Sequence, residues 1–203
     1  MVNNTYAKVK EIREYARDNK VPIMNQEGID FLTTFIIKHQ IKNVLEIGTA
    51  IGYSAIMMSL CSPTLKVTTI ERDEERYLEA IKNIKKLSLE DRITLIFNDA
   101  LKTRVEGKYD LIFIDAAKAQ NIKFFELFER NLNDGGFIIT DNMYLHGLVK
   151  KNEKEIKSRN VRGIVRKIKG YITFLKENDD YNTTIYDIGD GIAVSEKKTK
   201  GGA

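Results

Sequence analysis

The chain has little cysteine, little proline and no long apolar run, and each shortage excludes a class of protein. Only one of the 203 residues is cysteine and two are proline. Cys61 alone cannot form an internal disulfide or a thiolate metal site, and its position in the apolar run AIMMSLC favours a buried helix. No stretch approaches the roughly 18 apolar residues of a membrane span, and the polar N-terminus lacks signal-peptide character. We therefore expect a cytoplasmic protein with no membrane partner.

What remains is a balanced composition with an alternating pattern. The chain is 42% hydrophobic and 31% charged, which suits one globular domain spanning residues 1–203. Short β-branched runs alternate with stretches whose apolar positions recur every three to four residues. Strands separated by helices imply parallel βαβ crossovers, with helices on both faces of the sheet. The expected strands are 43–47, 66–71, 92–97, 109–115, 136–140, 183–188 and 191–196.

The two ends of the chain depart from this alternation. Only Gly189 and Asp190 separate the last two strands, so we expect a two-residue turn and an antiparallel hairpin. The result is an α/β, Rossmann-like, mostly parallel seven-stranded sheet with a C-terminal antiparallel hairpin. Within residues 1–40, Pro22 separates two predicted helices, roughly 5–17 and 27–38. We expect these helices to cover a sheet edge or the active site, or to form a dimer surface, and we expect a homodimer.

Positive charge is concentrated in one stretch. The net charge of the chain is +4, but residues 150–169 contain nine basic and two acidic side chains, a local +7 that leaves the rest at −3. Such a block favours a polyanionic partner. The alternative is a solvated helix face with a few ion pairs.

A glycine-containing segment, VLEIGTAIGYS, links the first predicted strand to a helix. Gly48 and Gly52 remove the Cβ atoms that would keep a ligand away from the backbone. The spacing is not the G-x-G-x-x-G of dinucleotide sites, and Glu46 would repel a pyrophosphate. The pattern E-x-G-x-x-x-G instead resembles motif I of class I S-adenosylmethionine-dependent methyltransferases. The alternative is an ordinary tight strand-to-helix turn.

Acidic residues also follow the next two strands. Glu71 ends the second strand, where a carboxylate can accept hydrogen bonds from both hydroxyls of a ribose. Asp99 and Ala100 follow the third strand, where a carboxylate and a backbone N–H can bind the edge of an adenine. Acids at three successive strand ends, all at the carboxyl edge of the sheet, favour a bound nucleoside cofactor over separate helix caps.

A second group of polar residues follows strands four and five. Asp115, Asp141 and Asn142 fall at the same edge of the sheet, and strands about 4.8 Å apart would let their oxygens converge. This all-oxygen set favours Mg²⁺, with Ca²⁺ or Mn²⁺ as alternatives. Lys118 follows Asp115 by three residues. It is expected to act as general base or to stabilise an oxyanion; the alternative is a solvent-exposed lysine at a helix start.

Together these motifs resemble the metal-dependent O-methyltransferases that include the catechol and caffeoyl-CoA enzymes. The resemblance covers residues 21–196 and rests on PIMNQEG, VLEIGTAIGYS, TIERDEERY, YDLIFIDAAK and TDNMYLHG. It implies that Asp115 both approaches the amino group of S-adenosylmethionine and binds the metal with Asp141 and Asn142, and that Asp115 and Lys118 are the catalytic residues. The positions implied to bind the cofactor are Met24, Glu46, Gly48, Gly52, Ser54, Glu71, Asp99, Ala100 and Asp115.

Within this family, the compact length and the segment SRNVRGIVRKIKGYITFL resemble the bacterial subgroup that methylates 5-hydroxyuridine at the tRNA wobble position to 5-methoxyuridine. An unpaired anticodon-loop base can enter a pocket while basic residues contact phosphates. Arg159, Arg162 and Arg166 share one predicted helix face and are the expected tRNA contacts, whereas Lys167 and Lys169 are predicted to point away.

Two alternatives to the tRNA substrate stay open. Enzymes for small catechols often have tryptophan in the pocket wall, and this chain has none, which weakens the first alternative, a small catechol or phenolic acceptor. The second is a non-catalytic RNA-binding relative. The presence of Lys118 and of the three predicted metal ligands argues against it.

Overall fold

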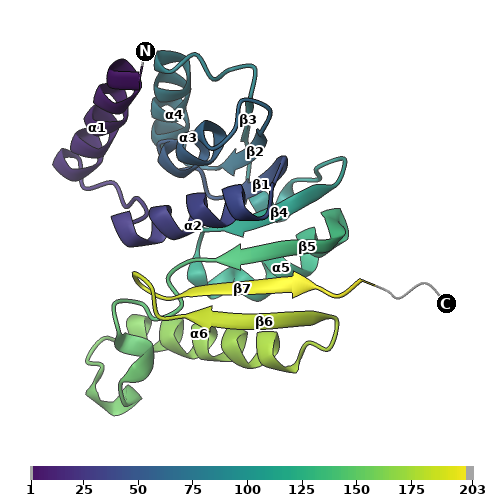
Figure 1. Ribbon diagram of the computed structural model, residues 1–203. Helices are drawn as coiled ribbons and strands as arrows, with labels where there is room; N and C mark the ends of the chain where they lie inside the picture. Colours follow the sequence, from purple (N-terminus) through teal and green to yellow (C-terminus); the bar gives the residue numbers. More distant parts are fainter. Residues whose placement is uncertain (1, 200–203) are drawn as a thin grey trace. The chain divides into compact units, whose positions relative to one another are not determined.

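Seven strands form the sheet of the computed structural model, in the order β3-β2-β1-β4-β5-β7-β6 (Figure 1). The structure describes residues 2–199, and the chain divides into two compact units, one up to Arg104 and one from Val105. The expectation of a single domain stays a prediction. Among the described helices, none combines the length and apolar character needed to cross a membrane.

The first unit contains three parallel strands and four helices. β1 pairs with β2 and β2 pairs with β3, all parallel, as the alternating pattern predicted. The predicted bounds agree with the observed ones to within three residues. The elements are α1 (Val2–Asp18), α2 (Gln26–Lys38), β1 (Asn43–Ile47), α3 (Tyr53–Leu60), β2 (Lys66–Glu71), α4 (Glu74–Lys86) and β3 (Ile93–Phe97), followed by the short helix η1 (Ala100–Lys102).

Local capping fixes where two of these helices begin. The Asn25 side chain accepts a hydrogen bond from the Gly28 amide at the start of α2. Asp73 does the same for the Arg76 amide at the start of α4. Each cap satisfies one of the amide groups that a helix leaves unpaired in its first turn, which stabilises the helix by about 1 kcal/mol. The bounds of these helices are therefore encoded by single residues just before them.

The second unit contains four strands and two helices. β4 pairs parallel with β5, and β7 pairs antiparallel with both β5 and β6, so the predicted C-terminal antiparallel hairpin is confirmed. Helices α5 and α6 lie behind these strands (Figure 1). The elements are β4 (Tyr109–Ile114), η2 (Lys118–Gln120), α5 (Asn121–Phe128), η3 (Glu129–Asn131), β5 (Leu132–Thr140), η4 (Leu148–Lys150), η5 (Glu153–Glu155), α6 (Arg159–Glu177), β6 (Tyr181–Tyr186) and β7 (Ile192–Lys197).

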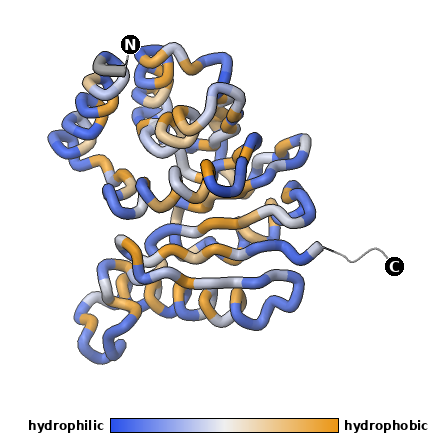
Figure 2. The backbone as a smooth tube through the Cα atoms, in the orientation of Figure 1, coloured by the Kyte–Doolittle hydropathy of each residue, from blue (hydrophilic) through white to orange (hydrophobic). Residues whose placement is uncertain are grey.

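Aromatic packing holds α6 against these strands. Phe125 of α5 contacts Phe174 and Tyr181 edge-to-face, with ring centroids 5.2 and 4.9 Å apart. Tyr171 is 1% exposed, and its hydroxyl pairs with that of Thr140 at 2.8 Å. Apolar residues run along β5 and β7 in the same region (Figure 2). Edge-to-face pairs add roughly 0.5–1.5 kcal/mol each beyond simple burial, so this cluster fixes the end of β5.

The hairpin turn differs from the prediction. β6 ends at Tyr186 and β7 begins at Ile192, so the connection has five residues rather than the predicted two. The carbonyls of Asp190 and Gly191 accept hydrogen bonds from the amides of Tyr144 and Met143. The turn is longer because its backbone pairs with the segment after β5 instead of closing directly on itself.

Gly191 is predicted to be the least replaceable glycine of this turn. Its φ is +84°, and an added Cβ would lie 2.6 Å from Cδ2 of the Tyr144 ring. Gly191→Ala should destabilise the protein by about 2–4 kcal/mol, combining left-handed strain with overpacking. Gly147→Ala is the matched control, because Gly147 has φ +78° but open space around it; its cost should be about 1 kcal/mol. Urea denaturation of both variants measures the difference, and equal losses would contradict the predicted clash.

Candidate active site

In the first unit, the β1–α3 loop has a left-handed backbone at three positions. Gly48, Ala50 and Gly52 have φ values of 97°, 47° and 84°. Only Ala50 carries a Cβ, which makes this conformation costly there. No side chain caps α3 after Gly52, so its first amides remain available to a ligand carboxylate, which the positive end of a helix favours.

Glu71 holds this loop in place. Its Oε2 accepts a hydrogen bond from the Ala50 amide at 2.7 Å, and its Oε1 accepts from the amides of Arg72 and Asp73 at 2.8 and 2.9 Å. An ionised carboxylate has about four acceptor positions, so the side chain, 8% exposed, retains capacity for a ribose hydroxyl. Glu71 therefore lies where the sequence predicted it and also stabilises the strained Ala50.

Glu46 lies near the carboxyl end of β1, as the sequence predicted. Its side chain is fully buried, and its two carboxylate oxygens accept hydrogen bonds from the hydroxyls of Ser54 and Thr69. Thr69 pairs in turn with the hydroxyl of Thr49. Direct contact of Glu46 with a cofactor stays a prediction, and the geometry favours an indirect role in bracing the loop. Sequence reasoning missed Thr69, although it lies two residues before Glu71 and therefore on the same face of β2.

The remaining cofactor candidates lie around the same strand ends. Asp99 caps η1 by accepting a hydrogen bond from the Leu101 amide, and its other oxygen is 3.8 Å from Arg72. Ala100 is 9% exposed. Met24 is buried, with its methyl group 3.0 Å from the position of a Cβ on Gly28. These positions agree with a nucleoside pocket wall, and their roles stay predictions.

In the second unit, two carboxylates interact at the carboxyl ends of β4 and β5. Asp141 is 4% exposed. Burial and the negative charge of Asp115 raise the pKa of Asp141 to about 7, against the opposing effect of Lys118. A buried carboxylate beside a second, half-buried one is unfavourable unless a cation or proton compensates the charge, so the chemistry of this pair suits a divalent ion.

Lys118 faces this acidic pair rather than solvent. Its Nζ lies 2.5 Å from Oδ1 of Asp115, and only 17% of its side chain is exposed. The alternative of a solvent-exposed lysine therefore does not describe its geometry. The contact sets the Lys118 side chain beside the acidic pair, where its positive charge can stabilise an oxyanion. General base catalysis by Lys118 stays the alternative prediction.

The predicted third ligand, Asn142, lies in a strained segment. Asn142, Leu145 and His146 all have φ between 46° and 60°, which is uncommon outside glycine. Oδ1 of Asp190 accepts a hydrogen bond from the His146 amide at 2.6 Å. Asp190, which the sequence analysis missed, therefore helps hold the segment, and its position between two glycines was the available signal. Such strain persists only where surrounding contacts impose it.

The fit to a metal ion is partial. Within residues 2–199 no group of three or more His, Cys, Asp or Glu side chains could hold an ion. The predicted set contains two carboxylates and one amide oxygen. Oxygen ligands of this kind suit Mg²⁺, but the set has two charged ligands rather than three. Metal dependence therefore stays a prediction.

The sequence profile described as O-methyltransferase matches residues 2–198. The chain belongs to the O-methyltransferase family.

Relatives of known structure support the assignment. A Staphylococcus aureus protein named after caffeoyl-CoA O-methyltransferase is 37% identical, with a TM-score of 0.90 over 97% of this chain and 100% of that one. An O-methyltransferase from Bacillus cereus, solved in complex with SAH, is 25% identical, with a TM-score of 0.81 over 95% of this chain and 91% of that one. These likenesses confirm the Rossmann-like α/β methyltransferase fold.

The match to one curated relative covers a smaller share of both proteins. The caffeoyl-CoA O-methyltransferase of Stellaria longipes is 29% identical over 159 residues, which is 73% of this chain and 66% of that protein. This chain thus spans just under two thirds of that relative. What the relative acts on does not by itself identify the acceptor of this family member.

The three arginines of the predicted tRNA face share one side of α6, but two of them bind the protein itself. Arg162 Nη1 donates to the carbonyl oxygens of Ile156 and Lys157 at 2.6 and 3.1 Å. Arg166 pairs with Glu153 at 2.8 Å. The prediction that Lys169 points away from this face is wrong, because Lys169 lies 3.8 Å from the same Glu153. The physical reason is that Lys169 follows Arg166 by three residues and Arg162 by seven, so the helical repeat places it on the same side of α6.

Proposed function

We propose that this protein is an S-adenosylmethionine-dependent O-methyltransferase with a divalent metal cofactor and that its acceptor is 5-hydroxyuridine at the tRNA wobble position. Family membership supports methyl transfer to oxygen, and the SAH bound in the Bacillus cereus relative supports the cofactor. The observation that carries the metal-dependent chemistry is the buried Asp141 next to the half-buried Asp115, with Lys118 beside them.

The residues of the two units have separate tasks in this proposal. In the first, Glu71 holds the cofactor ribose and the α3 amides hold its carboxylate. In the second, Asp115, Asp141 and Asn142 would hold the ion, which when bound lowers the pKa of a coordinated hydroxyl. The hydroxyl proton leaves to solvent, and the positive charge of Lys118 stabilises the resulting oxyanion electrostatically. This oxygen bonds to the methyl carbon of S-adenosylmethionine as the bond from that carbon to the sulfonium sulfur breaks, and S-adenosylhomocysteine leaves.

The support for a tRNA acceptor comes from the positive charge of one segment and not from the residues proposed to carry out methyl transfer. The segment 150–169 carries a local net charge of +7 and follows Asn142 closely in the chain. The second candidate is a small phenolic acceptor, favoured by the caffeoyl-CoA name of the Stellaria relative. A purely RNA-binding role is disfavoured, because RNA binding does not require the acid pair of Asp115 and Asp141 with Lys118.

A direct assay separates these candidates. The protein is incubated with S-adenosylmethionine, Mg²⁺ and one of two transcripts, a tRNA carrying 5-hydroxyuridine or the same tRNA with uridine. Nucleoside mass spectrometry should detect 5-methoxyuridine only in the first. A catechol and caffeoyl-CoA are assayed in parallel. Methylation of the phenols without methylation of the tRNA would replace the proposed acceptor with the second candidate.

A further inference from the structure

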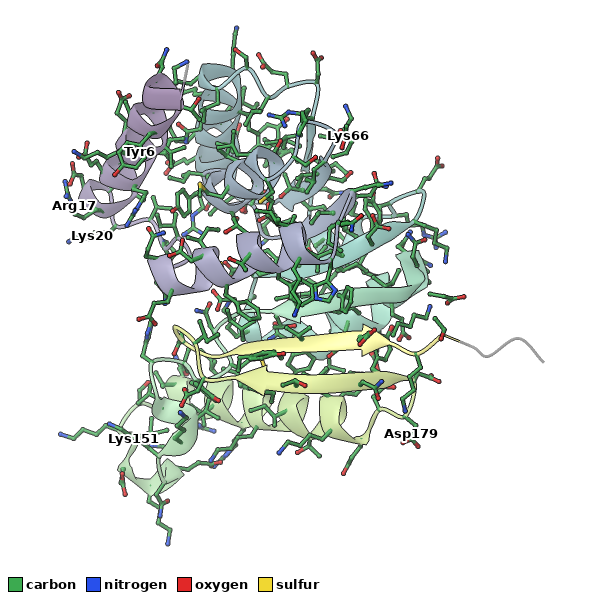
Figure 3. All side chains as sticks on the ribbon, viewed as in Figure 1. Tyr6, Arg17, Lys20, Lys66, Lys151 and Asp179 are labelled. Atoms are coloured by element: carbon green, nitrogen blue, oxygen red, sulfur yellow. The ribbon has the colours of Figure 1, made fainter. Side chains whose placement is uncertain are left out.

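The segment between Asn142 and α6 contains three exposed lysines that make no ion pair within the described residues. We call residues 148–158 the lysine loop; it contains η4 and η5. Lys151, Lys154 and Lys157 are exposed, and none makes an ion pair with another described residue. Figure 3 shows Lys151 projecting away from the ribbon at the outer end of this loop. Lys150 differs, because it pairs with Asp187 and lies over the Tyr144 ring.

The loop is held firmly on α6. Val149 and Ile156 are buried in one apolar cluster with Val165 and Ile168 of the helix. Glu153 binds Arg166 and Lys169, and the Arg166 hydrogen bond lowers the pKa of the Glu153 carboxyl. These contacts fix the loop backbone, so its exposed lysines can bind a partner without a large ordering cost.

The arginines of α6 and the lysines of the loop thus have different roles. Arg162 and Arg166 are bound to loop groups, so using them for a partner would break contacts that hold the loop. The three lysines can contact an anion with no such loss. Contact with a phosphate then releases counterions, which is the main source of affinity for nucleic acids.

We propose that the lysine loop, rather than the arginine face of α6, is the surface that contacts RNA phosphates. The inference rests on the proposed function for the identity of the RNA. The loop begins six residues after Asn142 in the chain. An RNA that places one nucleotide at the acidic pair therefore has its neighbouring phosphates close to the loop. Arg162 and Arg166 are positioning residues that hold the loop in its binding conformation.

The test compares two triple variants of equal charge change. One replaces Lys151, Lys154 and Lys157 with glutamine. The matched control replaces three exposed lysines elsewhere in the second unit with glutamine: Lys123, Lys167 and Lys176. Binding of the full-length protein to tRNA is followed by fluorescence anisotropy from 0.05 to 0.3 M salt. Exposed substitutions of this kind change folding stability by about 0.5 kcal/mol at most, which circular dichroism checks.

The salt dependence gives the decisive result. Each lost contact to single-stranded RNA reduces the slope of log K against log salt by about 0.7, so the loop variant should lose about 2 units of slope and bind on the order of 100-fold more weakly at 0.1 M salt. The control should bind as the wild type does. Arg166→Gln should weaken binding at every salt concentration but leave the slope unchanged, because it loosens the loop without removing a phosphate contact. An unchanged slope in the loop variant, or a reduced slope in Arg166→Gln, would overturn the inference.

Methylation, measured separately on the same samples, distinguishes this inference from the proposed function. If the wild type binds tRNA through the loop but transfers no methyl group to it, the inference stands and the proposed acceptor fails. If the wild type methylates tRNA and the loop variant does so with the same kcat/KM, the acceptor stands and the inference fails. Failure of the wild type to bind tRNA overturns both.

Discussion

Asp141→Asn is expected to reduce methyl transfer by on the order of 10³-fold or more, with the affinity for S-adenosylmethionine unchanged. The substitution preserves the shape of the side chain and an oxygen for the Asn142 amide, which now donates to Oδ1 at 2.7 Å. It removes the charge that would hold a divalent ion. Because that ion is expected to activate the acceptor hydroxyl, losing it removes electrostatic stabilisation of the transition state.

Folding should not suffer in this variant. Burial and Asp115 both disfavour the charged form of Asp141 and raise its pKa, so a neutral side chain is better accommodated there, and the Tm should be equal or higher. Asp134→Asn is the control, since Asp134 lies on β5, the strand that Asp141 directly follows, but is 66% exposed. The activity of this variant should match the wild type.

Calorimetry with Mn²⁺ or Mg²⁺ measures metal binding independently of turnover. Full activity of the wild type in excess EDTA would refute metal dependence.

Glu71→Ala should weaken S-adenosylmethionine binding by about 10- to 150-fold. Glu71 retains one acceptor position for a ribose hydroxyl, and one charge-assisted hydrogen bond of roughly 1.5–3 kcal/mol accounts for this range. Isothermal titration calorimetry measures the loss. Glu75→Ala is the matched control, because Glu75 is an exposed acid in the first turn of α4 and should leave the affinity unaltered. Wild-type affinity in Glu71→Ala would refute the ribose assignment.

The contact between Glu71 and Ala50 calls for a further variant. Some of the loss in Glu71→Ala could arise because the left-handed Ala50 is no longer held. Ala50→Gly removes most of the cost of that conformation, about 1 kcal/mol. If Glu71 acts mainly by holding the loop, adding Ala50→Gly to Glu71→Ala should restore most of the affinity. If it binds the ribose, the double variant should remain weak.

Local patterns in the sequence determined most of the architecture. The pattern of apolar residues placed all seven strands and the two helices before β1, because β-branched runs indicate strands and a repeat of three to four residues indicates helices. The exception in bounds is β5, which begins four residues before its predicted start. Gly48 and Gly52 marked the turn where a ligand can approach the backbone. The acids after successive strands identified the carboxyl edge of the sheet, because parallel strands all end at the same edge.

Only the tertiary structure decided which of these residues pair with one another. Glu46 faces inward because the register of β1 and β2 sets it opposite Thr69, 23 residues away. Glu153 binds Arg166 because the lysine loop folds back on α6, a contact that the helix pattern alone does not show. The five-residue hairpin turn likewise depends on the segment after β5, because carbonyl oxygens of the turn accept hydrogen bonds from amides of that segment. These contacts join residues 13 or more positions apart, and packing rather than local periodicity selects them.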